Sequence, residues 1–127
     1  MATFGKRSRT NLAQCHVDLQ VLFNEVIQYT DCAVICGHRG EKAQNEAYDN
    51  GFSQLKFPKS KHNSLPSMAA DVVPYPISWE NIKRFIDFGN FVLHIAQSLY
   101  KDGKISHKIV WGGTWTSFPD YPHFELR

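Results

Sequence analysis

The sequence lacks the marks of a disulfide-rich, zinc-finger or nucleic-acid-binding protein. Its three cysteines, Cys15, Cys32 and Cys36, form no CxxC pair, and an odd number leaves at least one thiol unpaired. Because all three lie among apolar residues, we expect reduced, buried cysteines that pack in a core. The formal charge of +2 is too small for a nucleic-acid-binding surface, so we expect no nucleic-acid partner.

Long apolar runs are also missing. The first residues, MATFGKRSRTNLAQ, contain no apolar signal-peptide region, and no stretch reaches membrane-spanning length. We therefore expect no membrane anchor. With 127 residues, of which 43% are hydrophobic, the chain is long enough for one core and too short for two ordinary domains. We predict a single domain over residues 1–127.

The spacing of apolar residues predicts a mixture of helices and strands. We expect helices at 12–27, 41–50 and 78–100, short strands at 33–36, 68–73, 109–111 and 122–126, and a long loop at 51–66. Thr10 or Asn11 is the expected N-cap of the first helix, and Ser78 that of the last. His16 and Asp18 lie off the apolar stripe and are expected at the surface. These elements predict a small α+β domain with a mostly antiparallel sheet covered by helices.

Four side chains with metal-site chemistry stand in two short segments. His62 and Asp71 belong to SKHNSLPSMAAD, and Asp120 and His123 belong to DYPH near the end of the chain. Asp71 lies between apolar pairs, where an ionised carboxylate is costly to bury unless it is paired, hydrogen-bonded or bound to a metal. Two histidines and one carboxylate can hold zinc with an open fourth position, which leaves a second carboxylate as general base. The pattern alone equally allows an exposed loop histidine, a hydrogen-bonded strand carboxylate and a half-buried strand histidine.

The local sequence around Asp120 and around Arg39 predicts that further side chains reach the same cleft. Pro122 excludes a regular helix between Asp120 and His123, so we expect a turn or bulge that brings both to one side. Arg39 lies at the turn from the first expected strand to the following helix, a common position for a side chain that enters a cleft. Gln44 follows on that helix and is expected to face the same cleft.

These motifs also resemble those of a known family. In order, the chain contains Ser60-Lys61-His62, Ala69-Ala70-Asp71-Val72, Trp-Gly-Gly-x-Trp, Phe118 and Asp120-x-Pro122-His123-Phe124-Glu125. They are similar to the zinc D-Ala-D-Ala carboxypeptidase family, which includes VanX- and VanY-type enzymes and the L-alanyl-D-glutamate endopeptidases that many bacteriophages use as endolysins. The resemblance runs from about Leu19 to Glu125. The short chain and the Asp at position 120 are most similar to the phage endopeptidase branch.

The resemblance implies a role for each matching residue. His62, Asp71 and His123 would bind a single Zn²⁺ at one end of the sheet. Asp120 would polarise the attacking water as general base. Arg39, in the Gly-x-Arg turn, would stabilise the oxyanion and hold the scissile carbonyl.

Other matching residues would bind substrate or support the site. Gln44 and Ser60 are expected to contact substrate or supporting groups, with capping of the helix and loop as the alternative. Trp111 and Trp115 either line the cleft or pack in the core, and we predict Trp111 as a substrate-binding residue. Glu125 is expected to be a supporting partner rather than a catalytic group.

The resemblance implies a zinc metallopeptidase that cleaves peptidoglycan stem peptides between L-Ala and D-Glu and lyses the host cell as a phage endolysin. It would be a monomer, made in the host cytoplasm and released to the cell wall by a separate holin-type protein. The alternatives are a D-Ala-D-Ala carboxypeptidase or dipeptidase, and a non-catalytic zinc-binding wall-recognition module. The sequence departs from the family in an insertion at 63–67 and in Asp120, which is one methylene shorter than glutamate.

Overall fold

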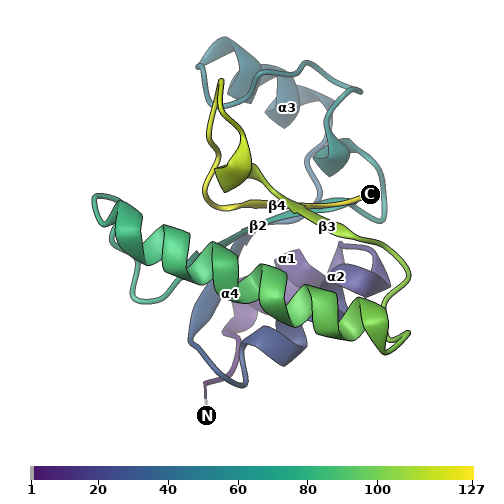
Figure 1. Ribbon diagram of the computed structural model, residues 1–127. Helices are drawn as coiled ribbons and strands as arrows, with labels where there is room; N and C mark the ends of the chain where they lie inside the picture. The colour runs from purple at the N-terminus through teal and green to yellow at the C-terminus, as the bar shows by residue number, and fades with distance from the viewer. Residues whose placement is uncertain (1) are drawn as a thin grey trace.

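The computed structural model describes residues 2–127, and within that range the chain forms an α+β fold, as predicted. The elements are α1 (Lys6–Ala13), α2 (Val17–Val26), β1 (Cys32–Cys36), α3 (Glu41–Asp49), η1 (Lys61–Asn63), β2 (Ala69–Pro74), α4 (Ile82–Lys101), β3 (Ile109–Trp111), η2 (Gly112–Thr114) and β4 (His123–Leu126). The strands form one antiparallel sheet in the order β1-β2-β4-β3. Figure 1 shows α1, α2 and α4 on one side of this sheet, and α3 with its following loop on the other.

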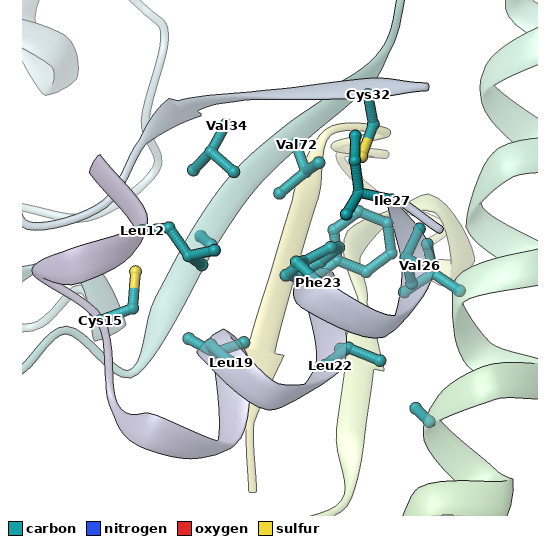
Figure 2. Close-up of a cluster of buried hydrophobic side chains, with 14 of the residues drawn as sticks. Leu12, Cys15, Leu19, Leu22, Phe23, Val26, Ile27, Cys32, Val34 and Val72 are labelled. Atoms are coloured by element: carbon teal, nitrogen blue, oxygen red, sulfur yellow. The ribbon is translucent and has the colours of Figure 1, made fainter. Parts of the chain in front are cut away.

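Alternation along β2 separates the core from the opposite face. Ala70 and Val72 belong to the hydrophobic core, whereas Asp71 between them belongs to the other face, because successive strand residues point to opposite sides. In β4, Phe124 and Leu126 enter the core, and His123 shares the face of Asp71. Figure 2 shows core side chains that α1, α2, β1 and β2 contribute. The sheet therefore holds a core on one face and polar side chains on the other.

The predicted helix at 12–27 is wrong at its start, because the chain forms two helices there. The break lies at residues 14–16, which pair with Ser67 as a short extended segment: the Ser67 N–H donates to the Gln14 carbonyl, and the His16 N–H donates to the Ser67 carbonyl. His16 then caps α2 in place of the expected Thr10 or Asn11, since its Nδ1 accepts the Asp18 N–H at 3.0 Å. A contact about fifty residues away in sequence thus overrides the helical periodicity.

The last helix, α4, matches its prediction apart from its first turn. Asn81, not Ser78, is the N-cap, and its side chain accepts the Arg84 N–H. Packing explains the glycine at position 89, because a Cβ on this residue would collide with the indole ring of Trp111. No helix within residues 2–127 is long and apolar enough to cross a membrane.

Candidate active site

His62 reaches the polar face of the sheet from η1. The Ser60 side chain caps this short helix by accepting the His62 N–H at 3.2 Å. His62 is 2% exposed, and its Nδ1 lies 2.7 Å from the Gly37 carbonyl oxygen. A carbonyl can only accept, so Nδ1 carries the proton that it donates. The other nitrogen, Nε2, points at Asp71 Oδ1 at 3.1 Å.

His123, at the start of β4, is held in the same manner through its other nitrogen. Its Nε2–H donates to Glu125 Oε1 at 2.8 Å, and the two side chains share a face because they are two residues apart on a strand. The Nδ1 atom therefore faces inward, 3.3 Å from Asp71 Oδ1. Glu125 is a supporting partner, as expected from the sequence.

The chemistry of this donor set fits zinc. The two inward imidazole nitrogens lie 3.1 and 3.3 Å from Asp71 Oδ1, close to the separation of about 3.3 Å between ligand atoms around tetrahedral zinc. Each outward nitrogen donates to a carbonyl or carboxylate, which is the usual way that proteins orient metal-binding histidines. Burial opposes ionisation of Asp71, but the histidines outweigh it and hold the pKa of its carboxyl well below its usual range.

Cys36, at the end of β1, places its Sγ within 4.8 Å of donor atoms of both His62 and Asp71, and this set of close donor atoms does not include His123. The Cys36 Sγ lies 3.9 Å from His62 Nδ1, the nitrogen already used by the Gly37 carbonyl, and not beside the inward Nε2. An ion bound at Nε2 would lie on the far side of the ring from this nitrogen, so we favour His123 over Cys36 as the third ligand. The expectation that all three cysteines pack in the core is wrong for this half-buried residue.

Asp120 lies beside the metal-site residues on the turn before β4. The His123 N–H donates to the Asp120 carbonyl at 3.2 Å, which closes the turn predicted around Pro122. Burial, and the nearby negative charge of Asp71, raise the pKa of the Asp120 carboxyl above its ordinary value. A raised pKa suits a carboxylate that accepts a proton near neutral pH.

Arg39 enters the site from the turn between β1 and α3, where the sequence placed it. Its Nη2 lies 3.5 Å from Asp71 Oδ2, and its Nη1 donates to Gln44 Oε1 at 3.0 Å. Gln44 is fully buried and also accepts from the Asn63 amide at 3.1 Å. In this arrangement Gln44 holds the arginine, which is the supporting contact that the sequence allowed beside a substrate contact.

A cleft of about 650 Å³ surrounds these residues. Its lining includes Arg39, Ser60, His62, Asp71, Trp79, Trp115, Phe118, Asp120 and His123. Ser60 therefore lies at the cleft, as expected, in addition to capping η1. Trp111 does not belong to this lining: it is 4% exposed and stacks on the core residue Phe124. The prediction that Trp111 lines the cleft is therefore wrong, and it is Trp115, 5.2 Å from the His123 ring, that lines it.

Comparison with known proteins agrees with this geometry. A profile of the phage L-alanyl-D-glutamate peptidase family matches residues 1–126. The chain belongs to this family. The predicted family and the predicted activity class, an endopeptidase that cleaves peptidoglycan, are therefore confirmed.

One solved structure supports the assignment of this phage-type peptidase. The chain is similar to the Serratia marcescens L-Ala D-Glu endopeptidase ChiX, with 28% sequence identity and a TM-score of 0.78. The similarity covers 98% of this chain and 90% of that chain, so the two share the whole fold. A search of curated protein sequences found no match.

A second cluster of histidines and carboxylate in the peptidase has a structural role. Asp18, expected at the surface, is 5% exposed, and its Oδ2 accepts from the backbone and side chains of both Ser106 and His107. These bonds tie the start of α2 to the turn before β3. His16 uses its Nδ1 to cap α2, and Asp18 Oδ2 is bonded to Ser106 and His107, so both atoms hold chain segments together.

Some residues that shape the active site had no sequence signal. The Gly37 carbonyl that orients His62 is a backbone group, and Gly37 is required because a Cβ would collide with the Asn11 carbonyl. Asn63, which the sequence placed in an insertion, donates to the Arg39 carbonyl at 2.9 Å. The SxxN spacing of Ser60 and Asn63, which forms a capping box, was the one readable sign of its role.

Proposed function

We propose that the chain is a zinc-dependent endopeptidase that hydrolyses the L-Ala–D-Glu bond of peptidoglycan stem peptides. The observation that carries this proposal is the convergence of His62 Nε2 and His123 Nδ1 on Asp71 Oδ1, with Asp120 and Arg39 in the same cleft. These three side chains would hold the ion. A zinc ion bound there would supply Lewis-acid activation of water and of the scissile carbonyl.

Proton transfer and stabilisation of the scissile carbonyl would be carried out by other residues of the cleft. Asp120 would take a proton from the attacking water and pass it to the leaving amine, for which its raised pKa is suited. Arg39 would hold the scissile carbonyl and stabilise the negative charge that develops on its oxygen. Its guanidinium is kept at the site by Gln44, which also prevents the cation from folding away into solvent.

We also propose the biological setting that the family relationship suggests. Residues 1–127 act as a single peptidase domain and as a monomer. The protein is made in the host cytoplasm and serves as a phage endolysin, reaching the cell wall after a separate holin-type protein permeabilises the membrane. The membership of a phage peptidase family supports this setting.

Mass spectrometry of purified peptidoglycan tests the proposed reaction. Digestion should release fragments with a new N-terminal D-Glu, and a zinc chelator should abolish them. Loss of terminal D-Ala alone would indicate a carboxypeptidase instead. Intact peptidoglycan in the presence of zinc-loaded protein would indicate a recognition module.

A further inference from the structure

The two ends of the cleft differ in chemistry, and the strand register defines them. In the antiparallel pair of β2 and β4, Asp71 lies opposite His123 and Ala69 lies opposite Glu125. One end of the cleft therefore lies toward the start of β2 and the C-terminus, and the other toward the end of β2 and the segment before β4. In Figure 1 the first end lies toward the C-terminus, on the right, and the second lies toward the beginning of α4, on the left. The candidate metal site lies between them.

The end toward the C-terminus is basic. Lys61 donates from Nζ to the Leu126 carbonyl at 3.1 Å, and Arg127 donates from Nε to Glu125 at 2.9 Å. Lys59 stands two residues before Lys61 and is exposed. These three cations all line the cleft, and among the described lining residues at this end only Glu125 is acidic. Because Glu125 is already bonded to His123 and Arg127, this end carries excess positive charge.

The opposite end is aromatic. Trp79, after β2, and Trp115 and Phe118, before β4, line the cleft there. Trp79 is 56% exposed, yet its ring is fixed by stacking on Phe85 with 5.5 Å between ring centroids. Phe118 is 37% exposed. Exposed aromatic rings beside an active site are suited to pack against an apolar face of a ligand.

The two sides of the scissile bond differ in chemistry in the same way as the two ends of the cleft. In peptidoglycan, the amine of L-Ala is joined to the lactyl group of N-acetylmuramic acid, so a sugar lies one residue before the bond. Beyond the bond, D-Glu carries a free α-carboxylate, and diaminopimelate in many walls adds another. The C–H face of a pyranose ring packs on aromatic rings, whereas carboxylates pair with lysine and arginine.

We propose that the aromatic end, formed by Trp79, Trp115 and Phe118, binds the amino sugar, and that the basic end, formed by Lys59, Lys61 and Arg127, binds the carboxylates beyond the scissile bond. This inference rests on the proposed cleavage between L-Ala and D-Glu. It assigns a direction to the substrate along β2 and β4, and it makes the enzyme selective for stem peptides that are still attached to glycan.

Three synthetic substrates separate the two ends. The first is N-acetylmuramoyl-L-Ala-D-Glu-diaminopimelate, the second replaces the muramoyl group by acetyl, and the third replaces D-Glu by D-isoglutamine. The ratio of kcat/KM between the first and second reports sugar binding, and that between the first and third reports carboxylate binding. Each ratio is measured within one enzyme preparation, so a loss of folded protein does not alter it.

Variants at the aromatic end should change only the sugar ratio. Trp79→Ala and Phe118→Ala should each lower it about fivefold and leave the carboxylate ratio unchanged. Phe118→Ala is the second variant because Trp79 also packs on Phe85. Tyr29→Ala, an exposed aromatic residue that is not part of the cleft lining, is the matched control and should change neither ratio.

Variants at the basic end should change only the carboxylate ratio. Lys59→Gln and Lys61→Gln should each lower it about threefold, the size expected for a partly exposed ion pair. Lys104→Gln, an exposed cation outside the cleft lining, is the control. Unchanged ratios, or an exchange in which the aromatic variants alter the carboxylate ratio, would overturn the proposed direction. Failure of the wild-type enzyme to cut any of the three at L-Ala–D-Glu would instead overturn the proposed function.

Discussion

Replacing Gln44 by leucine removes the buried amide that holds Arg39 in the active site. The Gln44 Oε1 accepts from Arg39 and from Asn63, and its Nε2 donates to Ser53 Oγ and to the Leu55 carbonyl. Leucine has a similar size but makes none of these bonds. The variant therefore tests whether a buried amide, which touches no proposed metal ligand, is needed to position the arginine.

The expected losses follow from these contacts. Four hydrogen bonds at a net value of about 1 kcal/mol each, with partial re-solvation of their partners, predict a fall of about 2–4 kcal/mol in the free energy of unfolding. The Arg39 guanidinium keeps only its longer contacts, 3.5 Å to Asp71 Oδ2 and 3.7 Å to Cys36 Sγ. We expect kcat to fall about 10- to 100-fold through misplacement of the guanidinium, while zinc affinity is unchanged.

Gln44→Glu is the matched control. Its carboxylate retains the acceptors for Arg39 and Asn63 but loses the donors to Ser53 Oγ and to the Leu55 carbonyl, so it should lose stability and retain most of kcat. Urea unfolding, zinc competition with a chromogenic chelator and steady-state cleavage of a muropeptide measure the three quantities. Equal kcat in the leucine and glutamate variants, or a leucine variant as active as wild type, would refute the positioning role.

Three further predictions concern the proposed metal centre. Asp120→Ala should retain zinc in metal analysis and lose turnover by about 10²- to 10⁴-fold, and near-normal turnover would remove its assignment as base. Glu125→Gln should weaken zinc binding by about 10- to 100-fold, since His123 loses its charged partner; unchanged affinity in chelator competition would contradict this. Burial opposes protonation of His62, but Asp71 raises its pKa in the metal-free protein to about 10, so zinc must displace this proton. Burial also opposes protonation of His123, but Asp71 and Glu125 outweigh it and raise the pKa of this residue as well, so zinc displaces a proton from each imidazole. Apparent zinc affinity should therefore rise about 10- to 100-fold per pH unit around neutral pH, with proton release visible by calorimetry in buffers of different ionisation enthalpy; a flat profile would count against the ligand assignment.

The sequence was most informative where a residue would destabilise the fold unless its surroundings compensate for it. An aspartate between apolar strand residues needs partners, and Asp71 has them in His62 and His123. Pro122 required a turn beside Asp120, and the structure has that turn. The apolar residues that flank Asp71 and the proline beside Asp120 are close neighbours in the chain, so local spacing reveals that a partner and a turn are needed, although His123 itself is distant in sequence.

Features set by distant contacts were not readable in the same way. The break before α2 depends on Ser67, more than fifty residues later, and the burial of Asp18 depends on Ser106 and His107. The choice between Trp111 and Trp115 as cleft residue depends on Gly89, which leaves room for one indole in the core. Periodicity within one segment carries no information about such partners.

A zinc titration of chelator-treated protein, with cleavage of a muropeptide followed at each addition, tests the proposed zinc centre most directly. We expect no cleavage without metal, then a rate that rises linearly and saturates at one zinc per chain, with D-Glu as the new N-terminus. His123→Ala and Asp71→Ala should neither bind zinc tightly nor recover activity. Full activity in the metal-free protein, or in either ligand variant, would contradict the proposed zinc centre.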